Sequence, residues 1–304
     1  MPRPIPVILN ATAGKGSGHD ASQQLREAFA AAGAEAHVMI ARDGEDISLL
    51  ARRAVREGHP IVVAAGGDGT VNAVATHVAG SASALGVLAM GTLNHFARDA
   101  GIPVEIEPAV RTIVAGHRMR VDVGAVNGKV FLNNSSIGLY PTVVIRRDNR
   151  RRRTGSGKWS ALFWASLTVL RRHPMLDMAL QVDGEVRRHR TPLVFIGNNE
   201  YVVEGLEAGK RSGLADGKLA IYITRRHGRR GLLALALRAL FGSLREALDL
   251  EAFTVTAVTI ATRRRFLPVA TDGEVTVMPT PLEYETRAGA LEVIVPAPAP
   301  EAAA

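Results

Sequence analysis

The fold is set by the segment Ile61-Val62-Val63-Ala64-Ala65-Gly66-Gly67-Asp68-Gly69-Thr70-Val71-Asn72, in which an apolar strand enters a glycine-rich turn that opens a helix. Glycines let the backbone turn sharply and come close to a ligand. The helix that follows presents N–H groups and a positive dipole end, which suit a phosphate. Thr70 can cap that helix or donate to a phosphate, and Asp68 can orient Mg²⁺ or a reacting hydroxyl. A plain tight turn capped by Asp68 is the alternative interpretation.

Strand and helix patterns alternate on both sides of this segment. The further strand patterns are Ile5–Asn10, His37–Ile40 and Leu85–Ala89, and the helix patterns are Ser22–Ala32, Ile47–Glu57 and a helix from about Val71. Such alternation predicts a mainly parallel sheet with helices on both faces. In a sheet of this kind, ligands bind where the loops follow the carboxyl ends of the strands.

Two more glycine-containing loops follow predicted strands. Met90-Gly91-Thr92-Leu93-Asn94-His95-Phe96-Ala97-Arg98-Asp99 offers an N–H and a hydroxyl at Gly91–Thr92, while Asn94 can fix the loop or a nucleotide group. Asn10-Ala11-Thr12-Ala13-Gly14-Lys15-Gly16-Ser17-Gly18 is typical of a phosphate loop, although it matches neither a Walker A sequence nor a dinucleotide fingerprint. Three such loops at strand ends favour a nucleotide site.

The pattern changes after Val121 to short strands separated by polar turns, the rhythm of an antiparallel β domain. The expected strands are Val121–Val126, Val130–Asn133, Met178–Val182, Leu193–Ile196, Leu219–Ile223, Phe253–Ala261, Arg265–Ala270 and Leu291–Val295. Two turns share a sequence, Val182-Asp183-Gly184-Glu185 and Thr271-Asp272-Gly273-Glu274. Asp-Gly is a common hairpin turn, so from sequence alone each is a turn before it is a site.

Composition narrows the class of protein. The chain has 304 residues, is 47% hydrophobic, contains no cysteine and carries a formal net charge of +8. These values predict globular domains without disulfides or thiolate chemistry, and a preference for anionic partners. No signal peptide pattern and no apolar run of about 18 residues is visible. We therefore expect a cytoplasmic protein that can touch a membrane from the side.

These loops, in this order, resemble the diacylglycerol kinase catalytic-domain family, bacterial lipid kinases related to sphingosine and ceramide kinases. The resemblance rests on Gly66-Gly67-Asp68-Gly69-Thr70-Val71-Asn72 and on Gly91-Thr92-Leu93-Asn94 with Phe96-Ala97-Arg98, and it runs from about Ile5 to Val295. It implies a three-layer α/β ATP-binding domain (residues 1–125) and an antiparallel β-sandwich domain for the lipid (126–296, with a last strand that can return to the first domain). Apart from the resemblance, the Pro/Ala-rich composition of residues 297–304 predicts a disordered tail.

The resemblance also assigns roles to individual residues. It implies nucleotide binding by Asn10, Gly66, Gly67, Asp68, Gly69, Thr70, Asn72, Gly91 and Thr92. It implies two catalytic acids: Glu274 as the general base toward the lipid hydroxyl and Asp68 as the organiser of Mg²⁺, with the reverse assignment open. The segment Ser212–Leu219 resembles a structural metal site, where Asp216, Gly213 and Lys218 would hold Mg²⁺ or Ca²⁺; a turn is the alternative for Asp216.

Two segments predict contact with an anionic membrane surface. A basic run comprises Arg146, Arg147, Arg150, Arg151, Arg152 and Arg153. Apolar residues at helical spacing follow at Trp159, Leu162, Phe163, Leu167 and Leu170, and again at Leu233, Leu237, Leu240, Phe241, Leu244 and Leu248. Basic residues and an amphipathic helix suit an anionic leaflet, although both apolar faces could instead pack on the β domain.

Two other functions remain open from the sequence. The first glycine loop would also suit a kinase of a soluble substrate such as NAD. The basic charge would suit a non-catalytic protein that binds nucleotides or nucleic acid, but aromatic content is only 5% and no nucleic-acid motif accompanies the charge. The identity of the lipid and the oligomeric state, a homodimer included, stay undetermined.

Overall fold

A computed structural model describes residues 3–11, 18–139, 141, 175–201, 211–224 and 250–297. The chain divides into two compact units, Met1–Val123 with Arg287–Ala304, and Gly124–Thr286. The glycine loop at residues 12–17, the basic run at 146–153, both predicted amphipathic helices and the tail at 298–304 lie outside the described residues. Among the residues that are described, no helix is long and apolar enough to cross a membrane.

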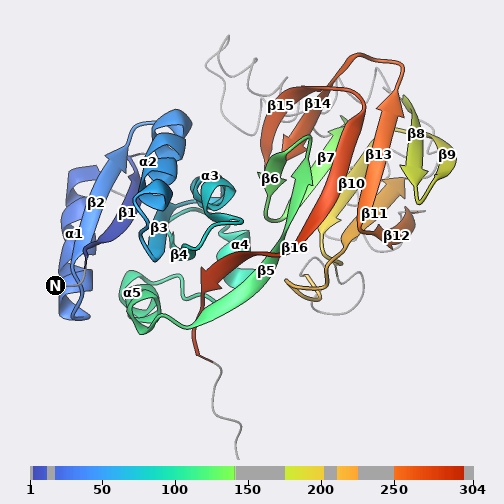
Figure 1. Ribbon diagram of the computed structural model, residues 1–304. Helices are drawn as coiled ribbons and strands as arrows, with labels where there is room; N and C mark the ends of the chain where they lie inside the picture. Colours follow the sequence, from blue (N-terminus) through green and yellow to red (C-terminus); the bar gives the residue numbers. More distant parts are fainter. Residues whose placement is uncertain are drawn as a thin grey trace, which may run out of the picture. The chain divides into compact units, whose positions relative to one another are not determined.

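The first unit contains a parallel sheet of β1 (Ile5–Asn10), β2 (Ala36–Ala41), β3 (Ile61–Gly66) and β4 (Ala84–Ala89), in the order β2-β1-β3-β4 (Figure 1). The end of β16 (Leu282–Ile294) joins it beside β4, where Val293 pairs with Leu85 in parallel register. All four parallel strands therefore present their carboxyl ends at the same edge of this sheet.

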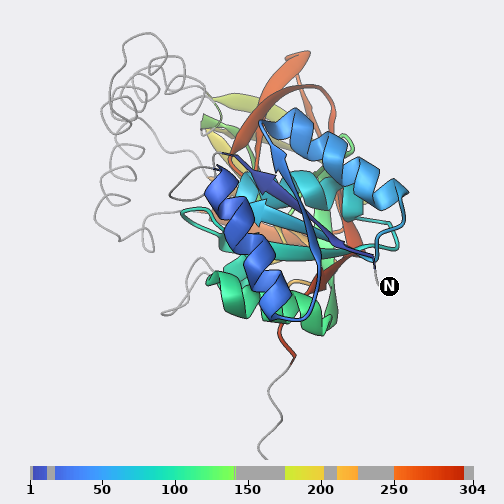
Figure 2. The ribbon, with the colours of Figure 1, turned by 90° about the vertical axis from the view of Figure 1, so that its left-hand side faces the viewer.

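Helices cover both faces of this sheet. They are α1 (Gly18–Ala31), α2 (Gly44–Arg56), α3 (Asp68–Val78), α4 (His95–Asp99) and α5 (Ile106–Ala115). Phe29 of α1 and Ile113 of α5 are almost fully buried and share a core with Val63 of β3. α2 packs against α3 instead. The helices α1 and α5 can be followed in Figure 2. Each fully buried aromatic or aliphatic side chain of this kind contributes about 1.5–3 kcal/mol.

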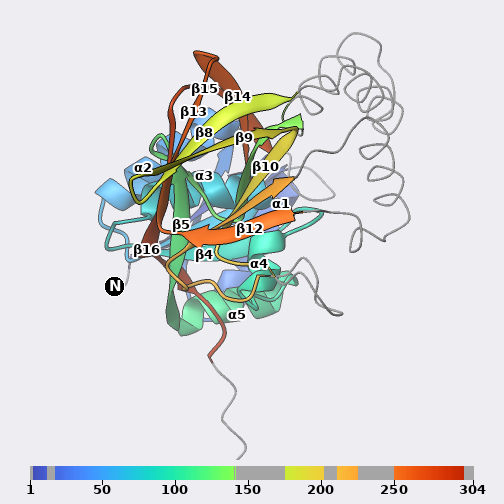
Figure 3. The same ribbon diagram turned by 90° about the vertical axis from the view of Figure 1, so that its right-hand side faces the viewer.

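The second unit contains two antiparallel sheets. One has the order β12 (Leu250–Val255), β11 (Leu219–Thr224), β10 (Leu193–Asn198), β7 (Asn134–Gly138), β14 (Phe266–Thr271) and β15 (Glu274–Pro279) (Figure 3). The other contains the start of β16, β13 (Ala257–Thr262), β8 (Leu176–Val182) and β9 (Glu185–Thr191). β5 (Arg118–Val126) pairs with β6 (Lys129–Phe131). Ile196 and Ile221 of the first sheet share one core with Leu180 and Ile260 of the second, so the unit is a sandwich.

The predicted fold class is confirmed, with a mainly parallel α/β sheet followed by an antiparallel sandwich. One predicted strand is wrong. Phe253–Ala261 is not a single strand: Phe253 pairs with Ile221 of β11, whereas Val258 pairs with Tyr284 of β16 in the other sheet. The chain changes sheets at Thr256, whose carbonyl oxygen accepts a hydrogen bond from the Thr286 N–H. Two apolar residues, Ala257 and Val258, are adjacent there and shift the alternation of apolar and polar residues by one position, which the single predicted strand does not take into account.

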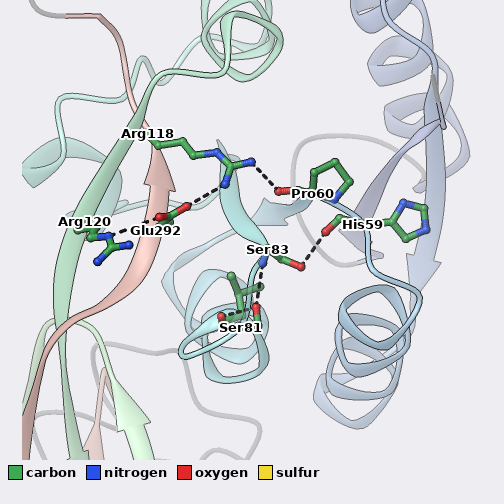
Figure 4. A network of polar contacts seen from close by, with 8 residues as sticks. His59, Pro60, Ser81, Ser83, Arg118, Arg120 and Glu292 are labelled. Atoms are coloured by element: carbon green, nitrogen blue, oxygen red, sulfur yellow. Dashed lines mark hydrogen bonds and ion pairs between the residues drawn. The ribbon is translucent and has the colours of Figure 1, made fainter.

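A polar network in the first unit attaches β16 to its neighbours (Figure 4). Arg118 Nη1 lies 2.8 Å from Glu292 Oε2, and Arg120 Nε lies 3.4 Å from Glu292 Oε1. Arg118 also donates to the Pro60 carbonyl oxygen at 3.3 Å, directly before β3. The hydrogen bond from Arg118 holds the pKa of Glu292 below its ordinary value.

Replacing Glu292 by Gln should lower the free energy of unfolding near pH 7 by about 0.2–1 kcal/mol, the usual range for partly exposed ion pairs. Because the pKa of Glu292 is depressed in the folded state, its contribution is present above the unfolded value of about 4.3 and is lost as the pH falls through the lower folded value. Urea unfolding near pH 7 and below about pH 4 should therefore show a difference that shrinks in acid. An equal difference at both pH values would contradict this explanation.

Candidate active site

The end of β3 and the start of α3 form the centre of the candidate site. Gly67 is the N-cap residue of α3, and no side chain of the described residues caps this helix. A Cβ atom added to Gly66 would collide with the side chain of Thr70, so this tight turn requires glycine. An uncapped helix start of this kind binds anions through its N–H groups and its dipole. The turn at Gly66–Thr70 is therefore shaped for a phosphate.

Asn10, at the end of β1, joins this turn. Its Nδ2 donates a hydrogen bond to Thr70 Oγ1 at 3.0 Å, although the two residues are 60 positions apart. Thr70 is 3% exposed and Asn72 is 5% exposed, so both polar side chains lie inside the fold. Of the predicted nucleotide-binding residues, Asn10, Gly66, Gly67, Gly69, Thr70 and Asn72 thus lie on β1, β3, the turn and α3.

The loop after β4 meets the first turn in close backbone contact. Gly66 accepts a hydrogen bond from the Met90 N–H at 2.9 Å, and a Cβ atom on Gly91 would lie 2.5 Å from Gly67 Cα. Asn94 fixes the loop, since its Oδ1 accepts from the Gly91 N–H and its Nδ2 donates to the Gly91 carbonyl oxygen, each at 3.0 Å. Asn94 therefore holds the loop itself, while Gly91 and Thr92 are exposed.

Asp68 lies where these two loops meet. Its Oδ1 accepts a hydrogen bond from the Phe96 N–H at 3.4 Å, which connects the first residue of α3 to α4. The side chain is neither fully buried nor fully exposed. A carboxylate beside an uncapped helix start can bind a cation that accompanies a phosphate group.

The donor set around Asp68 is compatible with Mg²⁺ only in the presence of a phosphate ligand. Among the described residues, no group of three or more His, Asp or Glu side chains could hold a metal ion. Mg²⁺ usually binds to one or two carboxylates together with substrate phosphates, rather than in an all-protein cage. One carboxylate at a phosphate-shaped turn fits that arrangement.

Replacing Gly91 by Ala should weaken nucleotide binding, because the added methyl group would push against the Gly67 backbone and Asn94 Oδ1. We expect a loss of stability of about 1–3 kcal/mol, as for other overpacked sites. Calorimetric titration with ATP and chemical unfolding would measure the two effects. Gly44→Ala is the matched control, since a Cβ atom at Gly44 meets nothing within 4 Å. Equal ATP affinity in both variants would contradict the proposed contact.

Glu274 begins β15 in the second unit, directly after the turn Asp272–Gly273. The turn residues have φ values of 47° and 84°, and Thr271 pairs with Glu274 across it, which confirms a tight hairpin turn. The Glu274 side chain is 63% exposed, and its Oε2 lies 3.9 Å from Lys129 Nζ. Lys129 also donates to Thr276 Oγ1 at 2.9 Å. Glu274 is thus an accessible carboxylate with a cation beside it.

The predicted structural metal site forms an exposed loop before β11. Ser212 Oγ lies 3.5 Å from Asp216 Oδ2, and a Cβ atom on Gly213 would lie 2.6 Å from Asp216 Oδ1. The structure therefore brings Gly213 and Asp216 together, while the Lys218 carbonyl oxygen accepts from the Asn199 N–H at 2.9 Å. One carboxylate with nearby carbonyl groups would supply only part of a Mg²⁺ or Ca²⁺ shell, so a metal here stays a prediction.

Two features were missed by reasoning from the sequence. Lys129 lies beside Glu274 although 145 residues separate them in the chain, and nothing in the sequence marks that pair. Asp272 carries three hydrogen bonds from the backbone of residues 132–134, whereas the sequence presents it only as a turn residue. Both depend on strand pairing that local patterns do not encode.

Comparison with known proteins identifies the family of this chain. The sequence model of the diacylglycerol kinase catalytic domain matches residues 4–126, and that of the YegS C-terminal NAD kinase beta sandwich-like domain matches residues 136–295, more than half of the chain. The chain belongs to the diacylglycerol kinase catalytic-domain family. The predicted family is confirmed, and both matched regions contain a candidate acid, Asp68 in the first and Glu274 in the second.

Curated members of this family include similar proteins. A diacylglycerol kinase from Staphylococcus carnosus (strain TM300) is 28% identical over 193 residues, which cover 63% of this chain and 62% of that protein. A diacylglycerol kinase from Staphylococcus aureus (strain MRSA252) is 31% identical over 196 residues, covering 63% and 61%. The chain therefore spans about three fifths of the length of the curated relatives that it matches.

Solved structures of this family share the fold over nearly the whole chain. A crystal structure from Bacillus anthracis str. Sterne, provisionally described as a diacylglycerol kinase, is 25% identical, with a TM-score of 0.73. The comparison covers 96% of this chain and 97% of that protein. A second structure from the same strain, at 22% identity and a TM-score of 0.68, shows the same fold.

Proposed function

We propose that this protein is an ATP-dependent lipid kinase that transfers the γ-phosphate to a hydroxyl group of a membrane lipid such as diacylglycerol. The observation that carries the proposal is the contact of two glycine loops at Gly67 and Gly91, beside Asp68 and the uncapped start of α3. Membership of a kinase family and relatives named diacylglycerol kinase support it.

The residues of the first unit would hold the nucleotide. The N–H groups of the Gly66–Thr70 turn and of Gly91–Thr92 would bind the phosphates, and Asn10 would keep Thr70 in place through its hydrogen bond. Asp68 would hold Mg²⁺ against these phosphates. When bound, Mg²⁺ would neutralise charge on the phosphate oxygens, which phosphoryl transfer needs more than it needs covalent chemistry by the protein.

Glu274 of the second unit would act as the general base. It would take the proton of the lipid hydroxyl while that oxygen bonds to the γ-phosphorus and the bond between this phosphorus and the β–γ bridging oxygen breaks, releasing ADP. Its exposed carboxylate, with Lys129 Nζ 3.9 Å away, is accessible to a hydroxyl. The reverse assignment, with Asp68 as base, is the alternative for the same reaction.

The membrane and the structural metal belong to this proposal. We propose that the protein acts at the cytoplasmic face of an anionic membrane, since its formal net charge is +8 and its substrate would be a lipid. We also propose that Asp216, with Gly213 and Lys218, holds Mg²⁺ or Ca²⁺ in the loop before β11.

Two rival functions are a kinase of a soluble substrate and a nucleotide- or nucleic-acid-binding protein without catalysis.

Incubation with γ-labelled ATP, Mg²⁺ and a total bacterial lipid extract would test the proposal. We expect label in the organic phase, and chromatography of the labelled product would identify the lipid. Label that enters only aqueous products, in the presence of NAD, would support the soluble-substrate rival. Salt-dependent binding to nucleic acid without any transfer of label would support the binding rival.

A further inference from the structure

Two hairpin turns with the same Asp-Gly-Glu sequence have the same backbone but different surroundings. Asp183 and Gly184 have φ values of 50° and 85°, and Asp272 and Gly273 have φ values of 47° and 84°. Val182 pairs with Glu185 across the first turn, as Thr271 pairs with Glu274 across the second. The two turns therefore form in the same way. Differences between the contacts of Asp183 and those of Asp272 are not needed to form the turn and must have another cause.

The Asp183 side chain is exposed, whereas the Asp272 carboxylate binds three consecutive backbone amides. Asp272 Oδ2 accepts from the Leu132 N–H at 2.7 Å, and Oδ1 accepts from the N–H groups of Asn133 at 2.8 Å and Asn134 at 3.0 Å. In addition, the Asp272 N–H donates to the Asn134 carbonyl oxygen at 2.9 Å. Residues 132–134 connect β6 to β7, so Asp272 joins this connection to the turn before Glu274.

The 132–134 connection is also held from its carbonyl side. Arg211, 8% exposed, donates through Nη1 to the Leu132 carbonyl oxygen at 2.6 Å and through Nη2 to Asn133 Oδ1 at 3.2 Å. Asn198 donates to the same Leu132 oxygen at 2.9 Å. Side chains therefore bind this connection both through its N–H groups and through its Leu132 carbonyl oxygen. Asp272 links the connection to the hairpin turn that precedes Glu274.

We infer that Asp272 is a positioning residue for Glu274, holding the proposed base and its neighbour Lys129 in one arrangement. Lys129 begins β6, which ends at Phe131 directly before the amides that Asp272 binds. The same carboxylate thus ties the strand that carries Lys129 to the turn that carries Glu274. This inference rests on the proposed function, because it assigns Asp272 a role in the reaction of Glu274.

An amide would not replace the carboxylate at this position. Three N–H donors need acceptors on both oxygens, and an Asn side chain would present its NH₂ group to at least one of them. Partial burial raises the pKa of the Asp272 carboxyl, while the three amides and the Arg211 guanidinium oppose that shift. The ionised form of Asp272 therefore depends on these donors. A hairpin turn by itself does not require such a set of contacts, as the exposed Asp183 shows.

The test compares Asp272→Asn with two controls. Asp183→Asn changes the exposed aspartate of the equivalent turn. Tyr284→Phe removes a buried hydrogen bond to Ser135, which lies beside Asn134, but leaves both Asp-Gly turn sequences and the Asp272 carboxylate unchanged. Under conditions in which every variant is folded, we expect Asp272→Asn alone to lower kcat by about 10–10²-fold, as a misplaced catalytic group does, with KM for ATP unchanged. A kcat within about twofold of the wild type would overturn the inference.

A second experiment separates positioning from a loss of folding. In a Glu274→Gln background, Asp272→Asn should cause no further loss of activity, because the group that it positions is already absent. An equal additional loss in that background would show a merely structural role and overturn the inference.

Amide hydrogen exchange tests the contact without any kinase assay. Exchange at residues 132–134 should be at least about tenfold faster in Asp272→Asn and unchanged in Asp183→Asn. If the wild type transferred no phosphate to lipid, the proposed function would fail. Faster exchange in Asp272→Asn would still support the contact between Asp272 and the amides of residues 132–134. Unchanged exchange in Asp272→Asn would overturn that contact and the inference with it.

Discussion

Asp68→Asn should abolish most of the transfer of phosphate to lipid while leaving the fold intact. The Asn side chain keeps an oxygen that can accept from the Phe96 N–H, so the contact between α3 and α4 remains. The negative charge that would hold Mg²⁺ against the phosphates is lost. Metal-assisted charge stabilisation is worth several kcal/mol, and each 1.4 kcal/mol or so is a factor of ten, so kcat should fall by about 10²-fold or more.

The control for this variant is an acid in the corresponding place on another helix. Glu45 lies in the first turn of α2, whose N-cap residue Asp43 accepts hydrogen bonds from the Glu45 and Asp46 N–H groups. Glu45→Gln should retain wild-type kcat, because Glu45 lies on α2, outside the Gly66–Thr70 turn and the Gly91–Asn94 loop. Steady-state assays over a range of Mg²⁺ concentrations would measure both variants. Wild-type activity in Asp68→Asn would remove this residue from the mechanism.

Glu274→Gln should lower kcat by about 10²–10⁴-fold, the contribution of a general base to proton transfer. KM for ATP should change little, because the predicted phosphate-binding residues belong to the other unit. Rapid-mix assays would record both effects.

Glu185→Gln provides the matched control, because Glu185 follows the Asp183–Gly184 turn as Glu274 follows the Asp272–Gly273 turn. Its side chain pairs only with Arg187 at 3.1 Å among the ion pairs of the described residues. We expect activity within about twofold of the wild type for a surface substitution of this kind. Wild-type kcat in Glu274→Gln, together with a large loss in Asp68→Asn, would assign the base to Asp68.

Much of the first unit could be predicted from the sequence, because its strands are buried on both faces and read as short apolar runs. The predicted Ile5–Asn10 coincides with β1, and Ile61–Ala65 falls one residue short of β3. The helix expected from about Val71 begins earlier, at Asp68, since glycines at the turn hide a helix start from propensity. α5 lacks a side-chain N-cap, and no sequence signal marked its start.

The second unit could be predicted as a class but not in detail. Its β9 strand, Glu185–Thr191, is almost entirely polar, so it lacks the apolar alternation that marks a strand. β16 runs from Leu282 to Ile294 and contributes to both units, whereas its sequence indicated only the last few residues. β9 is a strand through its hairpin pairing with β8, and β16 is extended by pairing with the distant strands β13 and β4.

In the candidate site, too, local sequence motifs could be predicted, whereas contacts between residues far apart in the chain could not. The predicted phosphate-binding turns are local sequence motifs. Gly66, Gly67 and Gly91 could therefore be singled out from the sequence without knowledge of the fold. The two Asp-Gly-Glu turns cannot be ranked in this way, because their sequences and backbones are the same. Only tertiary contacts, the amides of residues 132–134 on Asp272 and Lys129 beside Glu274, distinguish the turn of the proposed site from the Asp183–Gly184 turn.

The central claim is that the γ-phosphate of ATP passes to a lipid hydroxyl, and a double-label experiment tests it most directly. The protein would be incubated with Mg²⁺, vesicles that contain diacylglycerol, and ATP labelled either at the α- or at the γ-phosphorus. We expect γ-label, and not α-label, to enter the lipid phase with the wild type, and neither label to enter it with Asp68→Asn. Equal γ-label in the lipid phase with wild type and Asp68→Asn, or none with either, would contradict it.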